Sequence, residues 1–407
     1  IAKGNYDAAS LEEALRLNEQ AARCFPAGEI PVTFFSQQAE LLERLDRGRE
    51  ARAVRRLAAP SPGASARDLY LAGWEHARNC RFTKAVPLLE EATRKDPRAL
   101  WAWFLLGRCH DGLGRDADAI AAYDACLALD PDAYQVWFNR GLARLRRGEF
   151  RDARADFDRA VELKPDLADA YFNRALAKKE QRDYAGAEAD LTRALDCGST
   201  FTRIYFVRAQ VRTKLDDKAG AESDRKEGLT REPADESSWT ARGFARLASD
   251  PKGALADFER ALELNPQYLP ALHNKAAVLA DRLNRPADAV AVLDQAIRLR
   301  PEQPFLRAGR AVYLARLGRR GDAHKDAEEA LQLSGEPAIR YQIAGVYALT
   351  SKEHPEDRAE AFRLLASALK KDYGFELLDA DPELAPVRDL AEFKELVAAA
   401  RALRDRR

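Results

Sequence analysis

Methionine is absent from this chain of 407 residues, and cysteine is scarce. The five cysteines form no C-x-x-C pair; they are Cys24, Cys80, Cys109, Cys126 and Cys197. An odd number of scattered cysteines in a large chain is typical of reduced thiols, so we predict a cytoplasmic protein without a disulfide framework. Because the chain starts at Ile1 and contains no methionine, we expect it to be a piece of a longer protein.

An excess of charge of either sign is also lacking. Lys plus Arg and Asp plus Glu each total 66, so the formal net charge is zero. A balanced chain has no bulk electrostatic attraction for nucleic acid or for an anionic membrane. No apolar run approaches the roughly 18–20 residues that cross a bilayer. We therefore expect neither nucleic acid nor a membrane among the partners.

Catalytic and cofactor-binding motifs are missing as well. We find no G-x-G-x-x-G after a strand pattern, no P-loop, no G-x-S-x-G and no H-E-x-x-H. His76 and His110 lie 34 residues apart with Cys80 and Cys109 nearby, but no second pair of ligands has the short spacing of a zinc site. We expect packing histidines, no metal, no cofactor and no enzymatic activity in this stretch.

What the chain does contain is an internal repeat. The segment "WFNRGLARLRRGEFRDARADFDRAV" (137–161) returns as "YFNRALAKKEQRDYAGAEADLTRAL" (171–195), 34 residues later. Within each repeat a bulky residue recurs at the fourth position, a small residue at the eighth and alanine near the twentieth. These spacings predict two amphipathic helices per repeat that cross closely at the small residues. Prolines end most repeats: Pro97, Pro131, Pro165, Pro233, Pro266 and Pro301.

This W…G…A…F…A…P pattern resembles the tetratricopeptide repeat. The resemblance implies an all-α, right-handed superhelical solenoid of about ten helix-turn-helix units with a C-terminal capping helix. We expect degenerate or truncated helices of this kind in residues 1–65, and a capping segment in 376–407 with a helix from about Asp389. Between them we expect nine repeats, at 66–99, 100–133, 134–167, 168–201, 202–235, 236–268, 269–303, 304–336 and 337–375.

Arginine at the seventh position of a repeat occurs together with aspartate at the twenty-third. Where the seventh residue is Leu106, the twenty-third is Ala122, and Lys275 opposite Val292 is the one mixed case. We interpret the two residues as a salt bridge between the helices of one repeat, because a partly buried guanidinium needs a carboxylate. The alternative is a basic ladder for phosphate or nucleic acid, which would not require matched aspartates. The predicted pairs are Arg140 with Asp156, Arg174 with Asp190, Arg208 with Asp224, Arg242 with Asp257, and Arg310 with Asp326.

In tetratricopeptide repeats the first helices line a concave groove, and their second, fifth, sixth, ninth, twelfth and thirteenth positions face it. Here aromatic residues recur at the fifth position and asparagines at the sixth. Two interpretations remain open: packing between neighbouring repeats, or a groove that takes an extended or helical peptide. The predicted groove residues are Tyr70, Trp74, Trp101, Phe104, Phe138, Asn139, Phe172, Asn173, Phe206 and Asn274.

The resemblance implies a non-catalytic scaffold that binds a protein or peptide partner. The tail "YGFELLDADPELAPVRDLAEFKELV" (373–397) also resembles the end of such arrays in bacterial serine/threonine protein kinases. We therefore expect the recruiting or regulatory C-terminal region of a signalling protein, with self-association as a further role. The alternatives are a stand-alone adaptor for multiprotein assembly and the acceptor-binding arm of a glycosyltransferase. The incomplete asparagine ladder counts against the glycosyltransferase.

Overall fold

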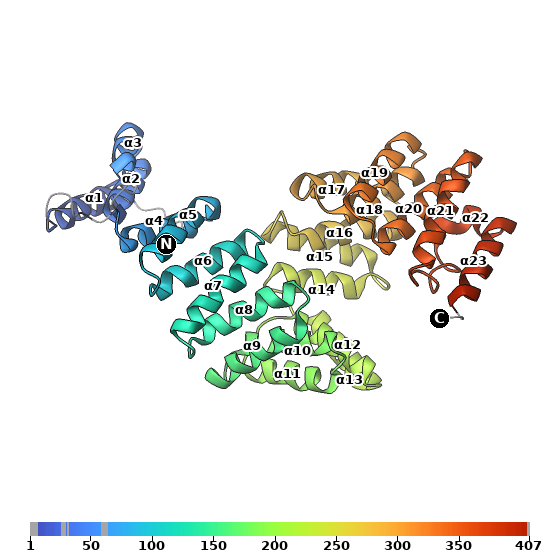
Figure 1. Ribbon diagram of the computed structural model, residues 1–407, viewed down its shortest axis with the longest axis horizontal. Helices are drawn as coiled ribbons and strands as arrows, with labels where there is room; N and C mark the ends of the chain where they lie inside the picture. Colours follow the sequence, from blue (N-terminus) through green and yellow to red (C-terminus); the bar gives the residue numbers. More distant parts are fainter. Residues whose placement is uncertain (1–6, 26–29, 31, 58–63, 405–407) are drawn as a thin grey trace. The chain divides into compact units, whose positions relative to one another are not determined.

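In the computed structural model of the chain, residues 7–25, 30, 32–57 and 64–404 are described (Figure 1). Every regular element within these residues is a helix. The segment predicted at 1–65 therefore has residues 1–6, 26–29, 31 and 58–63 outside the described residues, and the segment predicted at 376–407 has residues 405–407 outside them. The chain divides into two compact bodies, which we call the N-terminal body (1–199) and the C-terminal body (200–407).

The N-terminal body is a series of helix hairpins. Helices α4 and α5, α6 and α7, α8 and α9, and α10 and α11 pack as pairs, and each second helix also packs on the first helix of the next pair. The helices are α1 (Ala8–Ala22), α2 (Val32–Arg44), α3 (Gly48–Leu57), α4 (Ala66–Arg78), α5 (Phe82–Lys95), α6 (Leu100–Gly112), α7 (Asp116–Leu129), α8 (Tyr134–Arg146), α9 (Phe150–Leu163), α10 (Ala168–Glu180) and α11 (Tyr184–Asp196).

The C-terminal body continues the same pattern of hairpins, then passes through short, irregular helices and ends in one longer helix. Its elements are α12 (Arg203–Lys214), α13 (Lys218–Thr230), α14 (Glu236–Arg246), α15 (Pro251–Leu264), α16 (Leu269–Ala277), η1 (Val278–Arg282), α17 (Pro286–Leu299), α18 (Pro304–Arg316), α19 (Arg320–Leu333), α20 (Pro337–Thr350), η2 (Pro355–Asp357), α21 (Arg358–Leu369), η3 (Pro382–Leu384), α22 (Ala385–Arg388) and α23 (Ala391–Arg404).

The small residue at the eighth position lets the two helices of a hairpin approach closely. A Cβ atom on Gly141 would lie 2.7 Å from the ring of Phe157, and one on Gly107 would lie 2.5 Å from the ring of Tyr123. Both rings are completely buried. The recurring aromatic residues of the second helix therefore fill the space that the recurring glycines leave, as the spacing of small residues predicts.

The turn between the two helices of a repeat begins with a residue in the left-handed conformation. Gly148 and Gly318 have φ angles of +76° and +72°, and Arg182 and Asp216 occupy the same position with φ angles of +62° and +61°. This conformation ends the first helix and is easiest for glycine. Cys80, with a φ angle of +55°, occupies the same position in an earlier repeat, so at least three repeats tolerate a strained residue where others carry glycine.

One repeat contains an extra residue, and a π-helical turn absorbs it. The interval from Pro266 to Pro301 is 35 residues instead of 34. Helix α16 continues directly into the π-helix η1, where the amide of Leu283 donates to the carbonyl of Val278 at 3.1 Å, five residues earlier. Such single π turns accommodate insertions and are frequent at functional sites.

The C-terminal end of the array is covered by a helix. Helix α23 packs on α21, with the rings of Phe362 and Phe393 6.5 Å apart. Between α21 and α22 the chain turns back, and η3 packs on α20, where a Cβ atom on Gly345 would lie 2.8 Å from Cβ of Glu383. The fold predicted from the sequence, an all-α solenoid of helix hairpins with a C-terminal capping helix, is confirmed.

Candidate functional site

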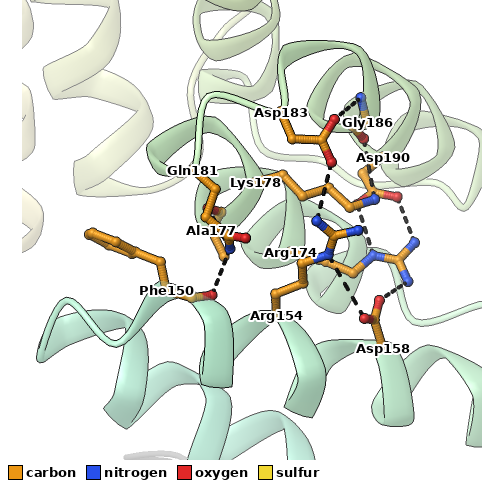
Figure 2. Close-up of polar contacts among 10 residues, drawn as sticks. All are labelled: Phe150, Arg154, Asp158, Arg174, Ala177, Lys178, Gln181, Asp183, Gly186 and Asp190. Carbon is orange, nitrogen blue, oxygen red and sulfur yellow. Dashed lines mark hydrogen bonds and ion pairs between the residues drawn. The ribbon is translucent and has the colours of Figure 1, made fainter.

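The arginines at the seventh position bind the aspartates at the twenty-third in fork geometry. In the pair that Figure 2 shows, Arg174 Nε donates to Asp190 Oδ2 at 2.8 Å, and Nη2 donates to Oδ1 at 2.6 Å. Asp190 is only 4% exposed. The Nη2–Oδ1 distance is 2.6 Å in the pairs of Arg140, Arg174, Arg208 and Arg310, and 2.8 Å in that of Arg242.

The same guanidinium also reaches the preceding repeat, which the sequence analysis missed. Arg174 Nη1 donates to Asp158 Oδ1 at 2.8 Å, and Arg140 Nη1 donates to Asp124 Oδ1 at 2.5 Å. Lys275 explains the mixed case, because its Nζ pairs with Glu259 of the preceding repeat at 2.9 Å. An acidic residue two positions after the twenty-third residue of the preceding repeat, whether or not that residue is aspartate, is the signal that could have predicted this link.

A second cationic side chain often pairs with the buried aspartate. Lys178 Nζ lies 2.8 Å from Asp190 Oδ2 (Figure 2), and Arg144 Nη1 donates to Asp156 Oδ2 at 2.9 Å. Burial alone would lower the pKa of Arg174, but its two carboxylate partners outweigh burial and hold that pKa above its usual value. The arginines are therefore neutralised within the fold.

The bulky residue at the fourth position packs against the guanidinium. The arginine Cζ atom lies 4.7 Å from the ring centre of Trp137 in the pair with Arg140, and 4.5 Å from that of Trp239 in the pair with Arg242. A flat guanidinium is held well by an aromatic face and a carboxylate fork together. The bulky residue at the fourth position and the aspartate at the twenty-third thus both hold the same arginine side chain in place.

Four of the predicted groove residues line one cavity of about 650 Å³ in the N-terminal body. Trp101 and Phe104 come from α6, and Phe138 and Asn139 come from α8. Trp101 is 65% exposed, and its ring meets that of Phe104 edge to face, with centres 6.1 Å apart. Polar residues also line this cavity, which we call the Trp101 cavity: Arg108, Asp130, Asp132 and Gln135.

The prediction that Phe172 and Phe206 face a groove is wrong, because both side chains are buried. They are 3% and 6% exposed, and the Phe206 ring fills the space above Gly228, where a Cβ atom would lie 2.8 Å away. At these two positions the packing interpretation holds. Tyr70 is partly buried against the hydrophobic core, and Trp74 is 41% exposed, stacked with Arg78, and outside the Trp101 cavity.

The predicted asparagines already use part of their hydrogen-bonding capacity. Asn139 Nδ2 donates to the carbonyl of Gln135 at 2.6 Å, and Asn173 Nδ2 donates to that of Asp169 at 2.8 Å. Asn173 does not line the Trp101 cavity, and Asn274 is a partly exposed residue of the C-terminal body. Only Asn139 therefore combines with the exposed aromatic residues.

A larger cavity, of about 800 Å³, lies in the C-terminal body and was not predicted. We call it the Tyr341 cavity. It is bordered by η1, α18, α20 and the segment 373–383, which turns back across the first helices of the last repeats. Aromatic side chains line it, namely Phe305, Tyr313, Tyr341 and Tyr373, together with the charged residues Asp281, Arg316, Asp381 and Glu383.

Of the two histidines near Cys80 and Cys109, His110 is buried and His76 is partly exposed. His110 is 5% exposed, and burial lowers its pKa. Across the residues that the structure describes, no group of three His, Cys, Asp or Glu side chains is arranged to hold a metal ion. No helix among them is long and apolar enough to cross a bilayer.

Comparison with known proteins identifies the repeat. A family model of the tetratricopeptide repeat matches residues 70–134, 138–200 and 246–304. No curated protein matches the sequence significantly. The human IFIT1 dimer with PPP-AAAA is similar in structure, with 15% identity and a TM-score of 0.51, over 84% of this chain and 91% of that one. A tetratricopeptide repeat protein from Parabacteroides merdae has 17% identity and a TM-score of 0.48, over 67% of this chain and 99% of that one.

Proposed function

The chain contains an array of tetratricopeptide repeats, and we propose that it is a non-catalytic scaffold that binds a protein or peptide partner in the Trp101 cavity. Arrays of this kind hold a large surface rigid, because every repeat is supported by its neighbours. The family match supports interaction with proteins as the general role. The partner and the residues that bind it are our proposal.

The exposed indole of Trp101 is the observation that carries this function. A tryptophan that is 65% exposed leaves a large apolar area in water, and tryptophan is enriched among the residues that dominate protein interfaces. Phe104 and Phe138 extend the apolar lining, and Asn139 and Arg108 add polar groups. Such a cavity suits an apolar anchor side chain of a peptide, with hydrogen bonds to the peptide backbone around it.

The charge distribution supports a protein partner rather than nucleic acid. The seventh-position arginines are bound to carboxylates, so the ladder that could have held phosphates is already neutralised, as for Arg310 between Asp326 and Asp294. The PPP-AAAA in the human IFIT1 structure is a property of that protein.

The proposal for the larger signalling protein rests on the sequence alone. We propose that the chain is the recruiting or regulatory region of a bacterial serine/threonine kinase, on the resemblance of residues 373–397, with self-association as a further role. The alternative is a stand-alone adaptor. A cytoplasmic location fits the exposed free thiols of Cys24 and Cys80, which such a compartment keeps reduced.

A peptide selection tests the proposed site. Peptides selected from a random twelve-residue phage library against the immobilised chain are expected to carry an aromatic or aliphatic anchor. Replacing Trp101 by serine should abolish their binding, whereas the control Trp74→Ser, also at an exposed tryptophan but outside the cavity, should leave it unchanged. Peptides that bind Trp101→Ser as well as they bind the unchanged chain would place the site elsewhere.

A further inference from the structure

The Tyr341 cavity carries more negative than positive charge. Its lining includes three carboxylates, on Asp281, Asp381 and Glu383, and one cation, Arg316. Arg316 Nη1 pairs with Asp281 Oδ1 at 2.6 Å, and its Nη2 pairs with Glu383. The single arginine is therefore shared between Asp281 and Glu383, and it does not pair with the third carboxylate.

Asp381 is the carboxylate that Arg316 does not neutralise. Its Oδ1 accepts the amide of Glu383 at 2.9 Å, and it forms no ion pair with any residue in the described part of the chain. Burial and the neighbouring Asp381 raise the pKa of Glu383 despite the pairing with Arg316. Two carboxylates so close together favour a further positive charge beside them.

Tyr341 provides a second indication of a ligand, next to the same Asp381 carboxylate. Its side chain is 5% exposed, and its hydroxyl has no hydrogen-bond partner among the described residues although it lies in the cavity wall. A buried polar group without a partner costs free energy, so such groups in native proteins call for an explanation. Burial raises the pKa of this phenol, and the Asp381 carboxylate close to its hydroxyl raises that pKa further through its charge and its position as an acceptor. The phenol therefore stays protonated, and its oxygen can still accept a hydrogen bond.

The walls of the cavity suit a cation with an apolar stem. The rings of Tyr341 and Tyr373 meet edge to face with centres 5.9 Å apart, and Tyr313 and Phe305 add further aromatic surface. Aromatic faces attract guanidinium and ammonium groups, and they also cover the methylene groups of arginine and lysine. The π-helical turn η1 brings Asp281 to the same cavity.

We propose that the Tyr341 cavity binds an arginine or lysine side chain of the partner protein, with the cationic group between Asp381 and the Tyr341 hydroxyl. This inference rests on the proposed function, since it names the chemistry of a second anchor on the partner. The net negative lining disfavours an anion. A metal ion does not fit either, because the described residues include no group of three ligands suited to one.

The test measures binding of peptides to the full chain by isothermal titration calorimetry. The parent peptide is selected from an acetylated, amidated hexapeptide library and carries one basic residue. Replacing that residue by citrulline, which has a similar shape without the charge, should weaken binding at least tenfold. A citrulline peptide that binds equally well would overturn the proposal. Arginine amide alone should bind far more weakly than the peptide; equal affinity would assign the cavity to a small free cation instead.

Variants of the chain locate the site. Asp381→Asn keeps an acceptor for the Glu383 amide but removes the charge, so it should weaken binding of the basic peptide at least tenfold. Asp379→Asn is the matched control, because its side chain is 88% exposed and lies outside the cavity lining. Tyr341→Phe removes only the unpaired hydroxyl, so it should fold normally and still bind the peptide several-fold more weakly. Unchanged affinity in both cavity variants would overturn the proposal.

The outcome also separates this inference from the proposed function. Peptides that bind, lose affinity in Trp101→Ser and show no preference for a basic residue would retain the scaffold and reject the cation site. Absence of any peptide binding in both selections would reject the two together.

Discussion

Arg310 connects two consecutive repeats through one guanidinium. Its Nη2 donates to Asp326 Oδ1 within its own repeat at 2.6 Å, and its Nη1 donates to Asp294 Oδ1 of the preceding repeat at 2.6 Å. The arginine thus holds the two helices of a hairpin together and at the same time ties that hairpin to its neighbour. Stability in a repeat array depends on both kinds of interface, so these side chains contribute to each of them.

Removing the buried carboxylate should be more damaging than removing the whole pair. Asp326→Ala leaves the guanidinium of Arg310 without its main partner, and breaking a buried pair in this way costs about 3–5 kcal/mol of the free energy of unfolding. The double variant Arg310→Ala/Asp326→Ala should lose less. Guanidinium unfolding followed by circular dichroism measures both values. A double variant that is no more stable than the single one would contradict the pairing.

Asp326 is the appropriate aspartate for this experiment. In the pair of Arg174 with Asp190, Lys178 also binds the aspartate, so the double variant of that pair still leaves one cation behind. Asp326 forms its ion pair with Arg310. The comparison of single and double variants is therefore cleaner in the later repeat.

Adding one methyl group at Gly141 should destabilise the chain. The new Cβ atom would lie 2.7 Å from the ring of Phe157, which is completely buried. Overpacking of this kind costs about 1–3 kcal/mol, and only part is offset by the better helix propensity of alanine. The control is Gly321→Ala in α19, where nothing lies within 4 Å and alanine should stabilise by up to about 1 kcal/mol. Thermal unfolding should shift in opposite directions for the two variants.

Replacing Arg182 by glycine should stabilise the chain. Arg182 is exposed and has a φ angle of +62°, a conformation that costs a residue with a Cβ atom roughly 1–2 kcal/mol. Part of that gain is offset by the greater freedom of glycine in the unfolded chain, so we expect a net increase of about 0.5–1 kcal/mol in the free energy of unfolding. The reverse change at the equivalent position, Gly148→Ala, should lower it. A loss of stability in Arg182→Gly would show that its side chain makes a contact of value.

The raised pKa of Glu383 should make stability depend on pH. Its carboxyl faces Arg316 on α18 and Asp381 beside it, and burial and Asp381 raise its pKa. The folded chain therefore holds this proton where the unfolded chain has lost it, and the contribution of Glu383 to stability falls as pH rises through that window. The other titratable groups that line the cavity are Asp281, Tyr313, Tyr341 and Tyr373.

Unfolding curves between about pH 4 and about pH 7 measure this dependence. Glu383→Gln should remove the part of the slope that comes from this residue, and Glu376→Gln, a change in an exposed glutamate of the same segment, should keep it. Identical slopes in the two variants would show that another group is responsible. A bound basic peptide should reduce the slope as well, because a cation favours the ionised carboxylate.

The repeat architecture could be predicted because each repeat packs its two helices with the same residue types at the same positions. Pairs such as Arg174 with Asp190 recur at the same two positions of several repeats, so the repeats of one sequence are enough to predict these pairs. The link to Asp158 leaves a weaker signal two positions later, because Thr192 and Lys226 occupy that place in two other repeats. Periodicity specifies which residues occupy equivalent places in the fold.

Periodicity does not specify how much of each equivalent residue stays exposed. Phe104 and Phe172 share the fifth position, yet one lines a cavity and the other is buried, because their neighbours differ. The Tyr341 cavity could not be predicted from the sequence for a different reason. It depends on a non-repeated segment, residues 373–383, that turns back over α20, and a contact of this kind leaves no period in the sequence.

The repeat that contains Lys275 differs from the others in the contacts that join its two helices. The ammonium group of Lys275 binds Glu259 of the preceding repeat, and its own hairpin has Val292 where others have the buried aspartate. The fork that clamps α16 to α17 is therefore missing, and the π-helical turn η1 lies in the same hairpin. If the C-terminal body were stretched by its ends, we expect this hairpin to yield at a lower force than the one held by Arg310.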